Sequence, residues 1–266
     1  MVRSFFIALQ FLTRVQIVSL DEFSQQDFSA STRAYPLVGL VMGTVNVVVF
    51  WVALVWLKVP VFPAAVLTTA ANIGLTGGLH LDGLMDTADS LFSWRSREKM
   101  LEIMKDSRIG ANAATALVTV LLLRVSLLTN LWGVLLPCLF LLPVLSRTAV
   151  VCLAYAFPHA TRQPGLGSGV IGRLSRKHLL AALAQALLCV GVWIVALRLL
   201  SSAPSGFWGA QALVLISVTG VVSGLLARTA QGRLGGITGD VLGAAVELSE
   251  TAALLAAVVV GGVWLS

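Results

Sequence analysis

The chain is poor in charge. Only 11% of its 266 residues are Asp, Glu, Lys or Arg, whereas 58% are hydrophobic. Soluble domains carry about 25% charged residues, so this composition excludes an ordinary soluble protein. It also excludes a disordered chain, which requires low hydrophobicity and high charge. An integral membrane protein remains.

Cysteine is equally scarce. Cys138, Cys152 and Cys189 lie in apolar runs, and none has a spacing typical of a zinc site. We therefore expect reduced cysteines that serve packing. The amino-terminal stretch up to Arg14 lacks a long apolar run and a cleavage site. It predicts an interfacial helix rather than a cleaved signal peptide.

Apolar blocks of about 20 residues recur along the chain, and this is the length that a helix needs to cross a bilayer. Seven spans are predicted, at residues 36–58, 61–80, 109–129, 131–155, 178–200, 207–228 and 241–265. The predicted fold is all-α. It is a polytopic helical bundle in a single domain, residues 1–266, with about seven transmembrane helices, an amino-terminal interfacial helix and a cytoplasmic acidic helical segment.

Basic residues collect on every second connection between these spans. The richest are the amino-terminal arm and residues 81–108, 156–177 and 229–240. The positive-inside rule places these connections in the cytoplasm. All acidic residues map to the same side or to helix ends that reach toward it. Such a face suits anionic lipids and anionic substrates. Nucleic acid is not an expected partner, because no basic patch is interleaved with exposed aromatic residues.

Three carboxylates follow the second predicted span. Asp82, Asp86 and Asp89 are spaced so that they share one face of a helix. Unpaired negative charges repel one another, and Mg²⁺, which prefers carboxylate oxygens, is a suitable counterion. The alternative is a solvated acidic helix start that interacts with the helix dipole. His80 lies off this face and is a general base, a ligand to the substrate or an ordinary interfacial histidine.

A second acidic stretch precedes the third predicted span. Glu98, Glu102 and Asp106 recur every four residues, a pattern also found in surface helices with internal ion pairs. Asp106 and Arg108 lie where the chain re-enters the membrane. An arginine at that position can bind a phosphate with two hydrogen bonds.

The glycine-rich stretch from Arg233 to Asp240 precedes the last predicted span. Clustered glycines allow backbone N–H groups to approach an anion at a helix amino terminus. Asp240, Glu247 and Glu250 can all face one interior stripe. Glutamates inside an apolar helix avoid lipid, so these residues predict either a site or a polar packing seam.

Three arginines remain to be placed. The loop that begins at Arg162 predicts a phosphate-accommodating loop or an ordinary turn. Arg147, beside Ser146, is expected to be buried and to pair with an acidic group or a phosphate. Arg124 lies nearer the outer face, where we expect it to extend toward the interface.

Carboxylates for a metal and basic groups for phosphates, gathered on one membrane face, predict phosphoryl transfer. One alternative is a membrane phosphotransferase of the CDP-alcohol type. A transporter is another, although transporter sites usually lie near the bilayer midplane. A non-catalytic scaffold is a third.

The same motifs resemble those of the adenosylcobinamide-GDP ribazoletransferase, or cobalamin synthase, family. The resemblance extends over nearly the whole chain. Its longest strings are His80-Leu81-Asp82-Gly83, Asp86-Thr87-Ala88-Asp89, the stretch from Glu102 to Gly110 and the stretch from Gly235 to Ala244. Shorter matches are Phe11-Leu12-Thr13-Arg14, Tyr35 to Gly39, Ser146-Arg147 and Pro164 to Gly167.

The resemblance implies a multi-pass enzyme of the bacterial cytoplasmic membrane whose active site faces the cytoplasm. Such an enzyme joins α-ribazole, or its 5′-phosphate, to adenosylcobinamide-GDP and releases GMP in a Mg²⁺-dependent reaction. Membrane lipids would surround it. A homo-oligomer and an association with other enzymes of nucleotide-loop assembly are further expected partnerships.

The motifs and the resemblance together predict three groups of site residues. The catalytic group is Asp82, His80, Asp86 and Asp89. The metal ligands are Asp82, Asp86, Asp89, Asp106, Asp240 and Glu247. The substrate-binding group is Lys105, Asp106, Arg108, Arg14, Arg147, Arg162 and Gly239.

Overall fold

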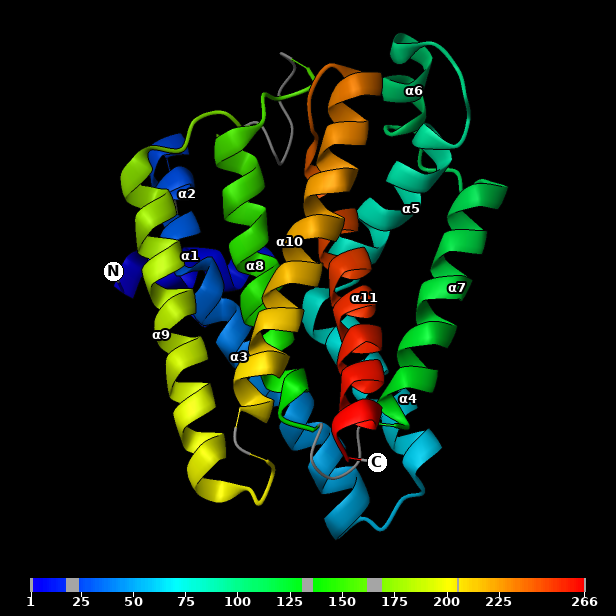
Figure 1. The fold of residues 1–266 in the computed structure, drawn as a ribbon. Coiled ribbons are helices and arrows are strands. Elements are labelled where there is room, and N and C mark those ends of the chain that lie inside the picture. Colours follow the sequence, from blue (N-terminus) through cyan, green and yellow to red (C-terminus); the bar gives the residue numbers. More distant parts are fainter. Residues whose placement is uncertain (1, 18–23, 131–135, 162–168, 205, 266) are drawn as a thin grey trace.

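The computed structural model describes residues 2–17, 24–130, 136–161, 169–204 and 206–265. These residues form a bundle of long helices that run roughly side by side, with shorter helices at one end (Figure 1). The long helices are α3 (Tyr35–Trp51), α4 (Val61–Thr76), α7 (Ala111–Leu128), α8 (Cys138–Ala156), α9 (Arg176–Leu200), α10 (Phe207–Leu234) and α11 (Gly239–Leu265). The shorter ones are α1 (Val2–Leu12), α2 (Gln25–Ser31), α5 (Leu79–Leu91) and α6 (Arg97–Ile103).

Six helical segments of the described residues are long and apolar enough to cross a membrane, or seven if one bent pair counts as a span. This confirms the predicted polytopic helical fold. The fourth predicted span, 131–155, corresponds to α8, and its first five residues lie outside the described residues.

The bent pair corrects the second predicted span. A continuous helix was expected over 61–80, but α4 ends at Thr76 and α5 leaves at 89° to it. The physical cause is the pair Gly77 and Gly78, which both adopt left-handed backbone conformations, with φ of 62° and 76°. Such conformations end a helix and favour glycine because it has no Cβ. The bend turns the acidic motif across the bundle instead of along it.

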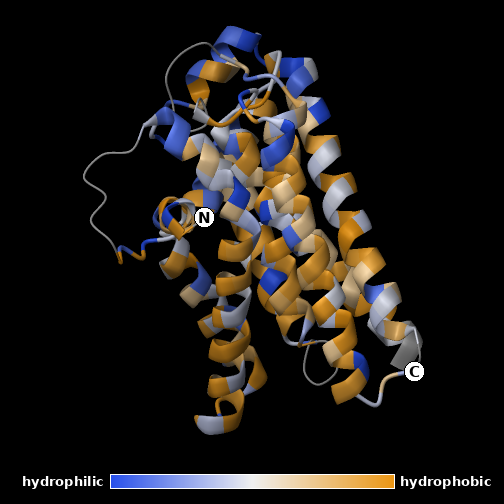
Figure 2. Cartoon of the chain, turned by 90° about the vertical axis from the view of Figure 1, so that its left-hand side faces the viewer, coloured by the Kyte–Doolittle hydropathy of each residue, from blue (hydrophilic) through white to orange (hydrophobic). Residues whose placement is uncertain are grey.

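Hydrophilic residues gather at the end of the molecule that carries α6, here named the polar end (Figure 2). The helix α1 lies across the long helices and buries one face, which includes Ile7, Ala8 and Leu12. A transverse amphipathic helix is the geometry expected of the predicted interfacial segment.

The apolar interior is divided by a polar layer. In α8, residues 139–145 belong to one apolar cluster and 150–154 to another, and Ser146, Arg147 and Thr148 lie between them. In α11, Glu247 to Thr251 occupy the corresponding position. The other buried members of this layer are Asn46, Thr68, Thr69, Asn72, Arg124, Thr219 and Ser223.

The polar layer corrects two expectations. Arg124 does not extend to the outer interface, because it is only 7% exposed and lies inside the bundle. Glu247 and Glu250 do not reach the polar end, because they lie between the two apolar clusters. Both predictions were wrong for the same reason. The sequence could not show that Arg124 on α7 faces Glu247 and Glu250 on α11.

Candidate functional site

Asp82 lies where two cavities meet. The wide cavity, of about 700 Å³, also has Arg14, Gly77 and Gly78 in its wall. The narrow cavity, of about 100 Å³, is lined by side chains that include His80, Arg147 and Asp240, together with Gly239. Asp82, Phe11 and Leu79 contribute to both walls. A carboxylate at this junction can contact a ligand that occupies either space.

Close packing of α5 against α11 brings Asp240 to the acidic face of α5. A Cβ atom added to Gly83 would lie 2.7 Å from the backbone oxygen of Asp240, and one added to Gly243 would lie 3.3 Å from Cα of Gly83. Small residues at such a crossing let two helices approach closely. The Asp86 carboxylate consequently interacts electrostatically with Asp82, Asp240 and Asp89.

This group of carboxylates forms no ion pair. No ion pair among the residues that the structure describes involves Asp82, Asp86 or Asp240. Within the same residues, no three His, Cys, Asp or Glu side chains are gathered as a preassembled metal centre. Mg²⁺ commonly uses one or two carboxylates and completes its shell with water and substrate phosphates. The donor set therefore fits a metal that arrives with a phosphate better than a closed protein cage.

Asp89 is turned toward α7. Its two carboxylate oxygens accept hydrogen bonds from the backbone N–H groups of Gly110 (2.6 Å) and Ala113 (2.9 Å). These groups belong to the start of α7, where backbone donors have no partner within the helix. A side chain at residue 110 would collide with this carboxylate. Asp89 thus fastens α5 to α7, a contact that sequence spacing did not reveal.

His80 shares the narrow cavity with Asp82, and Arg14 shares the wide one. His80 is buried, and its Nδ1 atom has no hydrogen-bond partner in the described residues. Arg14 contacts Gly77, and its backbone N–H donates to the carbonyl of Leu75 over 2.7 Å. The bend between α4 and α5 therefore also determines where Arg14 lies.

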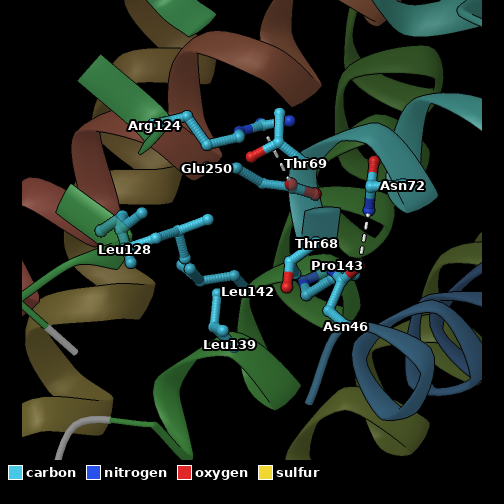
Figure 3. Close-up of a pocket in the computed structure, with 11 residues that line it drawn as sticks. Asn46, Thr68, Thr69, Asn72, Arg124, Leu128, Leu139, Leu142, Pro143 and Glu250 are labelled. Atoms are coloured by element: carbon cyan, nitrogen blue, oxygen red, sulfur yellow. Dashed lines mark hydrogen bonds and ion pairs between the residues drawn. The ribbon is translucent and has the colours of Figure 1, made fainter. Parts of the chain in front are cut away.

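Arg147 forms a buried ion pair with Glu250, and both also bond to the Ser146 hydroxyl. This confirms that Arg147 pairs with an acidic residue. Glu247, a predicted metal ligand, instead lies 2.8 Å from Nη2 of Arg124. Figure 3 shows Arg124 and Glu250 side by side at the edge of a small internal cavity.

Asp106 and Arg108 are paired with each other at the surface, where the Arg108 side chain is 88% exposed. The hydrogen bonds from Arg108 lower the pKa of Asp106 to about 2, and the same contacts raise the pKa of Arg108. Lys105 is exposed nearby. Arg162 lies outside the described residues. The structure does not bring Asp106 into the walls of either cavity.

Two arginines at the polar end bind helix ends. Arg97 donates to the carbonyls of Leu234 (2.6 Å) and Ala160 (2.7 Å). Arg233 donates to the carbonyl of Leu91 over 2.5 Å, and its guanidinium lies 4.3 Å from the ring centre of Trp94. Basic groups satisfy carbonyls at helix carboxyl termini in this way. These two positive charges therefore stabilise the fold, in addition to marking the side of the membrane that the positive-inside rule predicts.

The glycine-rich stretch before α11 has a structural role as well. Gly235 adopts a left-handed conformation after α10, and Gly236 packs against the backbone of residues 158–160. The N–H of Ile237 donates to the carbonyl of Pro158 over 2.9 Å and is not available to an anion. Of the predicted anion-binding stretch, Gly239 and Asp240 line the narrow cavity.

The chain was compared with known proteins. A family model described as cobalamin-5-phosphate synthase matches residues 4–258. A protein of Clostridioides difficile (strain 630) named adenosylcobinamide-GDP ribazoletransferase is 35% identical over 95% of this chain and 96% of its own length. Proteins with the same name from Desulfitobacterium hafniense (strain Y51) and Shigella boydii serotype 4 (strain Sb227) are 39% and 37% identical, over 96% of this chain and 96% and 99% of their own lengths.

No solved structure matches the chain. The matched residues 4–258 include residues that line both cavities, among them Arg14, Asp82, Arg147 and Asp240. The chain therefore belongs to the cobalamin-5-phosphate synthase family.

Proposed function

We propose that this protein is an adenosylcobinamide-GDP ribazoletransferase. It joins adenosylcobinamide-GDP to α-ribazole, or to α-ribazole 5′-phosphate, and releases GMP. The observation that carries the proposal is the position of Asp82, which lies at the junction of a wide and a narrow cavity and beside further unpaired carboxylates. The names of the relatives supply the substrates.

In the proposed reaction a ribose hydroxyl of α-ribazole attacks the phosphorus that is bonded to cobinamide. A new P–O bond forms, the bond between that phosphorus and the bridging oxygen of the diphosphate breaks, and GMP leaves with the bridging oxygen. The attacking hydroxyl loses its proton. The candidate acceptors are Asp82 and His80, which lines the narrow cavity and whose Nδ1 atom has no hydrogen-bond partner in the described residues.

Mg²⁺, when bound, neutralises the diphosphate and stabilises the charge that develops on the leaving group. Asp82 and Asp240 are the proposed ligands from the narrow cavity, with Asp86 close to both. Arg14 and Arg147 approach from other parts of the walls and supply positive charge toward the phosphates. Asp89 keeps a supporting part in this scheme, because its oxygens hold the start of α7.

The proposed location is the bacterial cytoplasmic membrane, with the polar end in the cytoplasm. The distribution of Lys and Arg over alternate connections supports this orientation. Substituted-cysteine labelling at Ser96 in the polar end and at Ser201 beside the opposite end would test it, since only one of the two should react from the cytoplasmic side.

The decisive experiment uses the purified protein in lipid nanodiscs. Adenosylcobinamide-GDP and α-ribazole are supplied with Mg²⁺ or with EDTA, and the corrinoid product and GMP are separated by chromatography. Equal amounts of corrinoid product and GMP, formed only with Mg²⁺, are expected. Absence of product with either acceptor overturns the proposal. Transfer from a labelled CDP-lipid, or corrinoid uptake by vesicles without transfer, would identify the two alternative functions.

A further inference from the structure

Arg147 is unusual among the basic residues of the site because it is almost completely buried. Only 2% of its surface is exposed, yet it lines the narrow cavity together with Asp82 and Asp240. No ion pair in the described part of the chain joins it to either carboxylate. A cavity lined by an arginine and by two acidic residues that do not pair with it suits an anion that carries a divalent cation.

The guanidinium keeps hydrogen-bonding capacity for such an anion. Its Nη1 atom donates to the Ser146 hydroxyl over 2.9 Å and to Glu250, whereas its Nε atom has no partner. An arginine has five N–H donors in a rigid plane, so fixing one end of the plane aims the others. A buried donor without a partner is costly unless a ligand satisfies it.

Glu250 is itself held from two sides. Its Oε1 atom accepts from the Ser146 hydroxyl over 2.7 Å and from Arg147. Its Oε2 atom lies 3.5 Å from Nη2 of Arg124, which also pairs with Glu247. Figure 3 shows that Arg124 and Glu250 reach the same space from different helices, α7 and α11. The carboxylate therefore cannot rotate away from Arg147 without losing these contacts.

We propose that Glu250 is a positioning residue, which holds the Arg147 guanidinium in the narrow cavity to receive a phosphate oxygen of the diphosphate. This inference rests on the proposed function, since that function supplies the diphosphate. It assigns a functional use to one part of the polar layer. The chemistry recognised is a pyrophosphate group with its Mg²⁺, whatever organic groups it carries.

The test is a double-mutant cycle read by binding rather than by turnover. Inorganic pyrophosphate is titrated, with Mg²⁺, into the protein in nanodiscs, and the dissociation constant is measured by calorimetry. Arg147→Lys and Glu250→Gln are each expected to weaken binding by about tenfold, because each removes or misplaces a charged hydrogen bond. The double variant should bind no more weakly than Arg147→Lys alone, because both changes act on one contact.

Gln211→Leu is the matched control. Gln211 is fully buried in α10 and donates to the carbonyl of Ala257 in α11 over 3.1 Å, without contacting Arg147. The substitution removes a buried polar contact to α11, the helix that carries Glu250. The dissociation constant for pyrophosphate should stay within about twofold of that of the original protein. Thermal unfolding, followed by a dye that reacts with the exposed thiols, verifies that each variant is folded.

If Glu250→Gln does not fold, Ser146→Ala tests the same network, because it removes one contact to each partner and leaves both charges. It should weaken pyrophosphate binding by a few fold. Unchanged binding in Glu250→Gln, or in Ser146→Ala where Glu250→Gln does not fold, overturns the inference, as do additive effects in the cycle. A protein that performs the transfer but does not bind pyrophosphate also overturns it, while the proposed function stands. Absence of transfer activity in the original protein would instead contradict the proposed function.

Discussion

Two groups of ionisable side chains lie in this bundle, and they differ in charge balance. The group on α5 and α11 consists of Asp82, Asp86 and Asp240, which form no ion pair among the described residues. The group in the polar layer pairs two arginines with two glutamates. Unpaired carboxylates call for a ligand, whereas paired charges stabilise each other. The comparison therefore separates a group that needs a ligand from a group that supports itself, and Arg147 links the two because it also lines the narrow cavity.

The largest expected effect comes from removing the junction carboxylate. Asp82→Asn should lower turnover by about 1000-fold or more, since it removes charge from the proposed metal and phosphate site. Assays of product formation in nanodiscs measure this, with Glu98→Gln on the exposed side of α6 as the control. The variant should remain folded, because Asp82 forms no ion pair. Near-normal turnover would remove Asp82 from the site.

Breaking the compensated group should affect stability instead. Arg124→Leu leaves the carboxylates of Glu247 and Glu250 with less positive charge in a buried position, which costs about 3–5 kcal/mol when one partner of a buried pair is lost. Reversible unfolding in detergent measures the change. Arg124→Lys is the matched control and should cost less, because it keeps the charge. A stability equal to that of the original protein would show that the pairs are dispensable.

The α5–α11 crossing can be loosened without changing any charge. In Gly83→Ala, the added methyl group would lie 2.7 Å from the backbone oxygen of Asp240, so the helices must separate. Overpacking of this kind costs about 1–3 kcal/mol, and we expect turnover to fall because Asp240 moves away from Asp82. Gly74→Ala in α4 is the control, since nothing lies within 4 Å of its added Cβ. Equal behaviour of the two variants would contradict the prediction.

The exposed pair at the polar end should have the smallest effect. The pKa of Asp106 is lowered to about 2 by Arg108, so its stabilising contribution is complete above the unfolded value near 4. It is lost only as the pH falls through about 2. Between pH 5 and 9, Arg108→Gln should therefore lower thermal stability only slightly, by the same amount at each pH, because exposed ion pairs contribute little. A large loss of stability, or a loss that varies with pH in this range, would contradict the assignment of an exposed pair.

Much of the fold could be predicted from the sequence. The apolar blocks identified the spanning helices, and the motifs around His80 and Asp82 identified the family. The bend at Gly77 and Gly78 was missed because a double glycine is compatible with both a helix end and a loosely packed span. Its angle depends on how α5 packs against α11.

The partners in the polar layer could not be predicted for a different reason. Arg124 and Glu250 are 126 residues apart, and periodicity within one helix says nothing about which helix it faces. Asp89 illustrates the same limit, because the helical spacing grouped it with Asp82 and Asp86 while its bonds are to α7. Spacing identifies residues that share a face, and tertiary packing decides what that face meets.

The bend between α4 and α5 also separates two mechanical tasks. Because two left-handed glycines join the helices at 89°, the axis of α5 does not continue that of α4. The orientation of α5 is set by α11 and α7 instead. We therefore expect these two contacts, rather than the tilt of α4 in bilayers of different thickness, to fix where the carboxylates of α5 lie.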